Sequence, residues 1–187
     1  MRAFEWLIGA VLVLAVMAIL IGLILPSQSV LSRSLVIDAP PARVYVVIRD
    51  LRHYEDFLPW DAPASDIVYR YPGATSGVAA RMEWQAVGPQ VSVGSLEITA
   101  ALEDRRIEMQ VRHDRDSRMM DNWLQLQPVE AGTRVEWGMR KELGWDLLGR
   151  YTAVLFDDAI GAQYERGLKR LRGGVEHGAA DGGEATS

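Results

Sequence analysis

An uninterrupted apolar segment near the start of the chain constrains everything that follows it. The run from Trp6 to Leu25 holds 20 residues and contains no charge and no proline. At about 1.5 Å of rise per residue, a helix of this length is about 30 Å long, which matches the hydrocarbon core of a bilayer. We therefore expect residues 1–26 to form a single membrane anchor, with the remaining chain held at the membrane surface.

Two other interpretations compete with the anchor. A cleaved secretory signal has a shorter apolar region, of about 7–15 residues, and a small-x-small cleavage site, for which Ser27–Ser29 is a weak candidate. A buried core helix would carry a polar stripe, and this segment has none. The Lys/Arg bias that orients membrane spans is nearly balanced, because Arg2 precedes the run and Arg33 follows it. The short basic start slightly favours an extracytoplasmic domain.

The composition beyond the anchor is that of one soluble domain. The 187-residue chain has a formal net charge of −5, and residues 26–173 contain 19 basic and 21 acidic side chains. A near-neutral domain lacks the basic face that binds nucleic acid, so we expect no such partner. The chain has no cysteine, and its three histidines are far apart in the sequence. We therefore expect no metal site and no cofactor.

Apolar periodicity predicts an α+β domain over residues 33–172. The segment 33–38 alternates as a strand does, and residues 41–51 and 53–57 have helical spacing. Six segments with a period of two follow between Ile67 and Glu142, and their short connections favour an antiparallel sheet.

The end of the domain returns to helical spacing. Residues 145–171 carry an apolar stripe that can be buried only against the inner face of the sheet. The predicted fold is a curved antiparallel sheet wrapped around one long C-terminal helix. Residues 27–32 read as a polar linker, and 173–187 as a disordered tail.

Four motifs in this order resemble the START/Bet v-type helix-grip superfamily, also called SRPBCC or polyketide cyclase/dehydrase-like proteins. They are Ser34–Pro41 running on to Val44, Asp50-Leu51 to Phe57-Leu58-Pro59-Trp60, Gly132–Val135, and Gly149-Arg150-Tyr151 through to Leu171. The segment Asp56–Trp60 is also similar to the coenzyme Q-binding START-like branch. The resemblance implies a helix-grip fold. It does not select one function, because the superfamily contains carriers, quinone binders, receptors and cyclases.

No local motif supplies a nucleophile or an acid–base pair. His53 lies near Asp50 and Asp56, but a histidine on a short helix beside a loop is more often solvated than catalytic. Three further polar residues sit on predicted strands, and without the register their direction stays open: Glu97, Asp121 and Asn122. We therefore assign no catalytic residue and expect a binding protein rather than an enzyme.

Large adaptable side chains gather on the predicted strands and the last helix. They form either a plain core or a core that also lines an apolar cavity, and we take the cavity as the working hypothesis. Its expected lining is Met82, Trp84, Met109, Trp137, Met139, Phe156 and Ile160. The resemblance suggests that Trp60 closes the mouth.

These observations predict a single-pass, membrane-anchored protein that binds a hydrophobic small molecule such as a lipid, quinone or isoprenoid. Two alternatives remain open: a polyketide cyclase/dehydrase-like enzyme, and a non-binding accessory module of a membrane complex. Facing ionisable groups in the cavity would favour the enzyme, and a filled interior would favour the module. The sequence indicates no particular protein partner.

Overall fold

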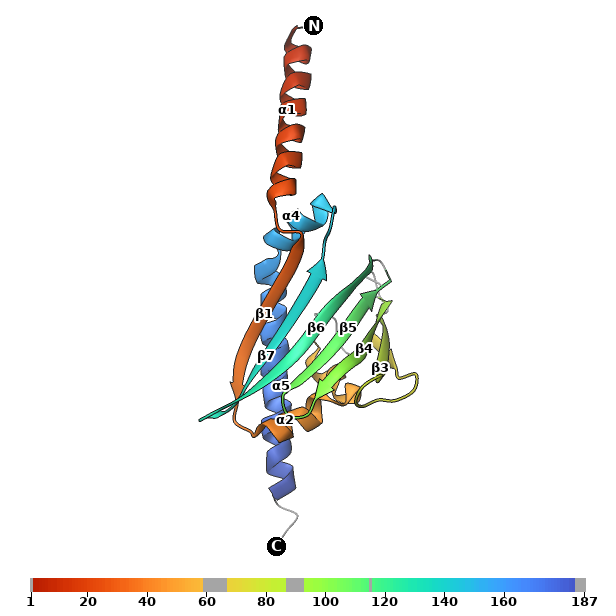
Figure 1. The fold of residues 1–187 in the computed structure, drawn as a ribbon, viewed down its shortest axis with the longest axis vertical. Helices are drawn as coiled ribbons and strands as arrows, with labels where there is room; N and C mark the ends of the chain where they lie inside the picture. The colour runs from red at the N-terminus through yellow and green to blue at the C-terminus, as the bar shows by residue number, and fades with distance from the viewer. Residues whose placement is uncertain (1, 59–66, 87–92, 115, 184–187) are drawn as a thin grey trace.

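The computed structural model describes residues 2–58, 67–86, 93–114 and 116–183 (Figure 1). The helices are α1 (Arg2–Ile24), α2 (Pro41–Ile48), the 3-10 turn η1 (Leu51–His53), α3 (Tyr54–Phe57), α4 (Leu147–Leu155) and α5 (Asp157–Gly183). The strands are β1 (Gln28–Ile37), β2 (Ile67–Arg70), β3 (Arg81–Ala86), β4 (Val93–Leu102), β5 (Arg106–His113), β6 (Asp116–Val129) and β7 (Gly132–Glu142).

The strands form one antiparallel sheet in the order β1-β7-β6-β5-β4-β3-β2. β1 returns to pair with β7 along its whole length, from Gln28 opposite Glu142 to Ile37 opposite Thr133. Alternation along each strand separates a buried face from a wet one, so that Val135, Trp137 and Met139 of β7 all point inward. This is the predicted helix-grip architecture.

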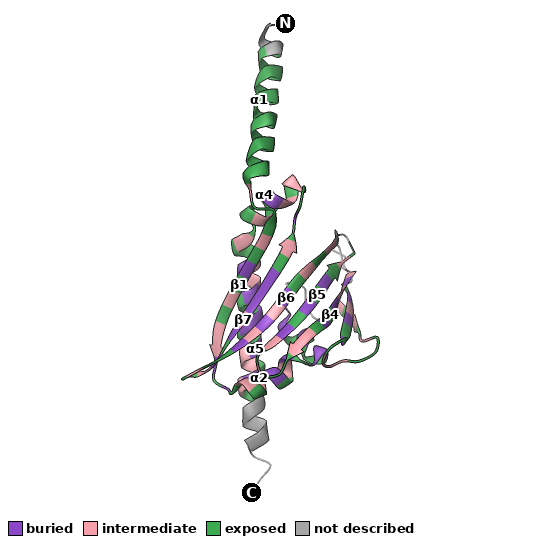
Figure 2. Cartoon of the chain, in the orientation of Figure 1, coloured by how far each residue is buried: buried purple, intermediate pink, exposed green. Residues whose placement is uncertain are grey.

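Helix α5 lies across the inner face beneath β1 and β7 (Figure 1). Its buried stripe consists of Tyr164, Leu168, Leu171 and Val175, at the spacing of successive helical turns. Figure 2 shows this core in purple and α1 as an exposed column that leaves the domain at one end. Almost none of the apolar stretch Trp6–Ile24 is buried, and it is long enough to cross a membrane.

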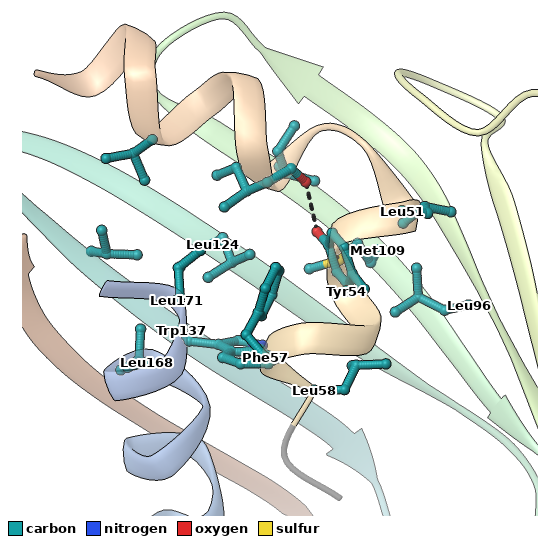
Figure 3. Close-up of a cluster of buried hydrophobic side chains, with 14 of the residues drawn as sticks. Leu51, Tyr54, Phe57, Leu58, Leu96, Met109, Leu124, Trp137, Leu168 and Leu171 are labelled. Atoms are coloured by element: carbon teal, nitrogen blue, oxygen red, sulfur yellow. Dashed lines mark hydrogen bonds between the residues drawn. The ribbon is translucent and has the colours of Figure 1, made fainter. Parts of the chain in front are cut away.

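The other end of the inner face is covered by α2, η1 and α3. Pro41 opens α2 at a position where its missing N–H costs nothing, as the sequence predicts. Figure 3 shows Tyr54 and Phe57 of α3 turned toward the sheet and toward α5. The Tyr54 hydroxyl is fully buried and donates to the carbonyl of Ile48 over 2.8 Å, which fixes α3 against α2.

The C-terminal helical region differs from the single helix expected over 145–171. It breaks at Phe156, whose φ of −108° and ψ of 8° end α4, and the acidic pair Asp157-Asp158 then opens α5. Acidic residues stabilise the first turn of a helix, so the pair marked this boundary in the sequence.

The structure also places parts of the expected linker and tail in regular elements, and residues 184–187 of that tail lie outside the described residues. All but the first residue of 27–32 belongs to β1, because β7 is long enough to pair with it. Helix α5 continues past Gly173 to Gly183. Val175 is buried, and the Glu176 carboxylate accepts from the backbone N–H of Asp38 over 3.1 Å, which holds this extension against the domain.

Candidate ligand-binding cavity

A cavity of about 330 Å³ lies between the inner face of the sheet and the first turns of α5. Its walls are mostly apolar, and they include Leu58, which directly follows α3, and Ile160 of α5. The described lining is Leu58, Trp84, Leu96, Met109, Val111, His113, Met120, Asn122, Trp137, Met139, Lys141, Ile160, Gln163 and Tyr164.

The register of three neighbouring strands explains the sheet side of the cavity. Met109 of β5 lies opposite Asn122 of β6, which lies opposite Met139 of β7. Side chains that are paired across an antiparallel sheet point to the same face. One polar amide is therefore flanked by two flexible methionine side chains on the cavity wall.

Four aromatic rings follow one another from α3 through β7 to α5, and two of them, Trp137 and Tyr164, line the cavity. Figure 3 shows the part of this row that Tyr54, Phe57 and Trp137 form. Ring centroids are 4.7 Å apart between Tyr54 and Phe57, 5.8 Å between Phe57 and Trp137, and 5.0 Å between Trp137 and Tyr164. Gly167 lets α5 approach this row, since a Cβ there would lie 2.7 Å from Cζ3 of Trp137. The helix is thus held tightly at Gly167, and the open space lies toward its N-terminal end.

A polar group is buried inside this apolar surface. The Tyr164 hydroxyl donates to Oδ1 of Asn122 over 2.7 Å, and burial raises the pKa of that phenol. Nδ2 of Asn122 and Nε1 of Trp137 are also buried, and neither has a partner among the described residues. Buried donors are normally paired, so two unpaired donors on residues of one cavity lining are unusual.

The structure brings five of the expected lining residues into the cavity: Trp84, Met109, Trp137, Met139 and Ile160. Met82 is fully buried in the core and lies outside the cavity lining. Phe156 is 55% exposed and lines a neighbouring groove instead. Trp60 lies outside the described residues.

Of the three strand residues whose direction was open, Asn122 points inward, whereas Glu97 and Asp121 are exposed on the outer face. The direction of the Asn122 side chain depends on the strand register, which the sequence alone does not give. Tyr164 belongs to the apolar stripe predicted over 145–171, but no sequence pattern indicates its hydrogen bond to Asn122 of β6.

The possible acid–base group does not lie in the cavity. Asp50 accepts hydrogen bonds from the Arg52 guanidinium, with Nη2 to Oδ2 at 2.6 Å, and this contact holds the pKa of Asp50 below its usual range. His53 and Asp56 line a separate depression beside the C-terminal half of α5. Within the described ranges, no cluster of three or more His, Cys, Asp or Glu side chains could hold a metal ion.

A set of hydrogen bonds from Arg150 joins α4 to the end of α1. Nη1 of Arg150 donates to the carbonyls of Gly22, Leu23 and Leu25 over 3.2, 3.2 and 3.0 Å, and its Nε donates to the carbonyl of Gly144 over 3.0 Å. The last carbonyls of a helix lack intrahelical partners and carry partial negative charge, so a cation stabilises them. Nothing in the sequence pattern indicated this role.

A sheet closed by one long helix over an apolar cavity defines a helix-grip protein. Residues 28–176 match the family model described as polyketide cyclase / dehydrase and lipid transport, and the chain belongs to this family. The superfamily inferred from the four motifs is therefore confirmed. Among curated proteins, none matches the chain.

Solved structures share the fold at low sequence identity. Protein CV1439 of Chromobacterium violaceum is 19% identical with a TM-score of 0.59, over 79% of this chain and 97% of that one. TTHA0849 of Thermus thermophilus is 21% identical with a TM-score of 0.57, over 80% and 98%. SA2116 of Staphylococcus aureus, a protein of unknown function, is 10% identical with a TM-score of 0.63, over 82% and 96%. These similarities extend to the fold alone.

Proposed function

We propose that this protein is a membrane-anchored carrier or receptor for a hydrophobic small molecule, such as a lipid, quinone or isoprenoid. The observation that carries the proposal is the 330 Å³ apolar cavity with two unpaired buried donors in its wall. Its volume falls at the lower end of the range typical of small-molecule sites, about 300–1,000 Å³. The family's description, which includes lipid transport, supports the same class of ligand.

The polar atoms of the cavity wall restrict the chemistry of the proposed ligand further. An unpaired buried donor costs about 1–3 kcal/mol, so a ligand oxygen that accepts from Nδ2 of Asn122 recovers that cost. The ligand we propose therefore has an apolar body and at least one carbonyl or comparable acceptor oxygen. A quinone or an oxygenated isoprenoid meets both conditions.

The contacts of α1 support a retained anchor over a cleaved signal. Arg150 is 8% exposed and directs its guanidinium at the carbonyls of residues 22, 23 and 25. Cleavage near Ser27 would remove these acceptors from a buried cation, and a buried charge that loses its partners is strongly destabilising. The length and apolar character of Trp6–Ile24 then favour a single membrane span.

Binding is better supported than catalysis. A cyclase or dehydrase needs an acid–base pair at the reacting atoms. Three ionisable side chains line the described part of the cavity: Tyr164, whose raised pKa keeps it protonated near neutral pH, and the half-buried His113 and Lys141. No carboxylate occurs among the described residues of the lining.

A matched pair of ligands tests the proposal. Menadione and 2-methylnaphthalene share a fused-ring skeleton, and only menadione carries carbonyl oxygens. The full-length protein in detergent should bind menadione about ten-fold more tightly, the equivalent of one hydrogen bond of about 1.4 kcal/mol. Asn122→Leu should abolish that preference while binding the hydrocarbon as well as before. Failure of both compounds to bind would contradict the proposed cavity, and equal affinities would contradict the role of Asn122.

A further inference from the structure

In helix α4 a charged side chain is buried and several apolar side chains are exposed, which is the reverse of the arrangement usual in a surface helix. Of its nine residues, Arg150 is the buried one. Leu148 and Leu155 are each 74% exposed, and Trp145, just before the helix, is 85% exposed. Contiguous exposed apolar side chains mark a surface that contacts something other than water.

The position of α4 is fixed relative to α1. Besides the three carbonyls held by Arg150, the Tyr151 hydroxyl donates to the carbonyl of Ala18. Ala18 lies six residues before the end of α1, which corresponds to about 9 Å along the helix axis. α4 therefore contacts the last turns of the apolar helix, at the end of α1 that adjoins the sheet (Figure 1).

The connection between α1 and the sheet is short and hydrogen-bonded. β1 begins at Gln28, four residues after α1 ends, and the backbone N–H of Leu143 donates to the carbonyl of Ser27 over 2.8 Å. The domain cannot move away from the end of the span without breaking these bonds. If α1 crosses a bilayer, the exposed side chains of α4 are carried to the depth of its headgroup–acyl boundary.

A groove of about 540 Å³ runs between α4, the end of β7 and the start of α5. On the α4 side it is lined by Leu148, Thr152 and Phe156 among others. On the other side, it shares four lining residues with the ligand cavity: Met139, Lys141, Ile160 and Gln163. The groove therefore adjoins the cavity, and these four side chains form part of the wall of both.

We propose that α4 lies in the headgroup–acyl boundary of the bilayer that α1 crosses, so that the groove beside it opens to lipid and admits apolar ligands to the cavity directly. This inference rests on the membrane anchor of the proposed function. The occupant of the apolar surface is the bilayer itself, because the span and the surface are joined by Arg150 and Tyr151. Trp145 then takes the interfacial position that tryptophan prefers, and Leu148 and Leu155 extend into the acyl region.

Site-directed spin labelling tests the placement cleanly, since the chain contains no cysteine. A nitroxide is placed singly on the full-length protein at Leu148→Cys, Leu155→Cys and the groove residue Phe156→Cys. Leu14→Cys in α1 reports on the span. Leu102→Cys is the matched control, because it is a similarly exposed leucine at the end of β4, on a strand that lies apart from α4.

The labelled proteins are reconstituted in vesicles of phosphatidylcholine and phosphatidylglycerol, and collisions with oxygen and with a water-soluble nickel complex are measured. We expect labels at 148, 155 and 156 to lose nickel collisions and to gain oxygen collisions, as the label at 14 does, while the label at 102 remains accessible to nickel. Oxygen dissolves in the acyl region and nickel is excluded from it, so this pattern places α4 and the groove in lipid.

Three results would overturn the inference. If 148, 155 and 156 are as accessible to nickel as 102 while 14 is not, α1 spans the bilayer but α4 stays in water, and the proposed anchor survives. If 14 is also accessible to nickel, the anchor itself fails. If 148 and 155 are shielded from both reagents, the surface of α4 is covered by protein, either a second copy or another partner.

Discussion

The Tyr164 hydroxyl and Oδ1 of Asn122 are joined by a buried hydrogen bond of 2.7 Å that links α5 to β6. The bond leaves the amide nitrogen of Asn122 as an unpaired donor on the cavity wall. The same contact therefore fastens the long helix to the sheet and holds the group that we propose recognises the ligand.

A double-mutant cycle measures this contact. Tyr164→Phe and Asn122→Leu each leave the other partner unpaired in an apolar surrounding, so each should lower the free energy of unfolding by about 1–3 kcal/mol. The double variant replaces both with apolar groups and should cost about 1 kcal/mol less than the sum. Urea unfolding of the full-length protein in detergent measures the effect, and strictly additive costs would show that the bond contributes nothing.

Two glycines of α5 should respond oppositely to the same substitution. A Cβ at Gly167 would lie 2.7 Å from both Cζ3 of Trp137 and the carbonyl oxygen of Phe57, whereas nothing lies within 4 Å of one at Gly173. Gly167→Ala should therefore cost about 1–3 kcal/mol through overpacking. Gly173→Ala should raise helix stability by up to about 1 kcal/mol. Thermal unfolding compares the two, and similar melting temperatures would contradict the close approach of α5 to Trp137.

Asp50 should make stability depend on pH in acid. Its hydrogen bonds from Arg52 place the pKa of the folded state below the ordinary value of 3.8. The stabilisation is complete above that ordinary value and disappears as pH falls through the lowered pKa. The free energy of unfolding of Asp50→Asn should thus be lower than that of the wild type by a constant amount from pH 5 to 8. This difference between the two proteins should shrink below about pH 4. A deficit that persists unchanged in acid would argue against this ion pair.

Arg150 should fix the direction of α1 relative to the domain. Arg150→Met removes the donors to the last carbonyls of α1 and retains similar bulk, so α1 should tilt over a wider range. Electron–electron distance measurements between nitroxides at Val16→Cys and Leu102→Cys should show a broader distribution in this variant. Arg140→Met removes an exposed arginine of β7 and serves as the control, for which the distribution should stay narrow.

The strands of the sheet and the apolar stripe of the last helix could be predicted from the sequence, because strands repeat every two residues and helices about every 3.6. β5 and β7 alternate clearly, and the stripe from Tyr164 to Leu171 recurs at helical spacing. The start of β1 was not readable, because residues 28–32 are strand only through their pairing with β7. The apolar residues of this segment, Val30 and Leu31, are adjacent and lie between polar ones, so the segment does not alternate as a strand does.

The polar parts of the candidate site could not be predicted for a different reason. Whether Asn122 faces the cavity depends on a register that a slip of one residue reverses. Arg150 acts on backbone carbonyls more than 120 residues away, and carbonyls carry no sequence signature. The apolar residues could therefore be predicted from the sequence, whereas the groups that we propose select a ligand and orient the anchor became apparent only in the structure.

The most direct test of the cavity is native mass spectrometry of the full-length protein released gently from membranes. Wild-type protein should carry an added mass from an oxygen-containing apolar compound. Met139→Trp, which fills the cavity, should lose that mass, and Met119→Trp, which adds the same side chain at an exposed position of β6, should retain it. A wild-type protein without any bound compound, or equal occupancy in the two variants, would contradict a ligand-binding function for this cavity.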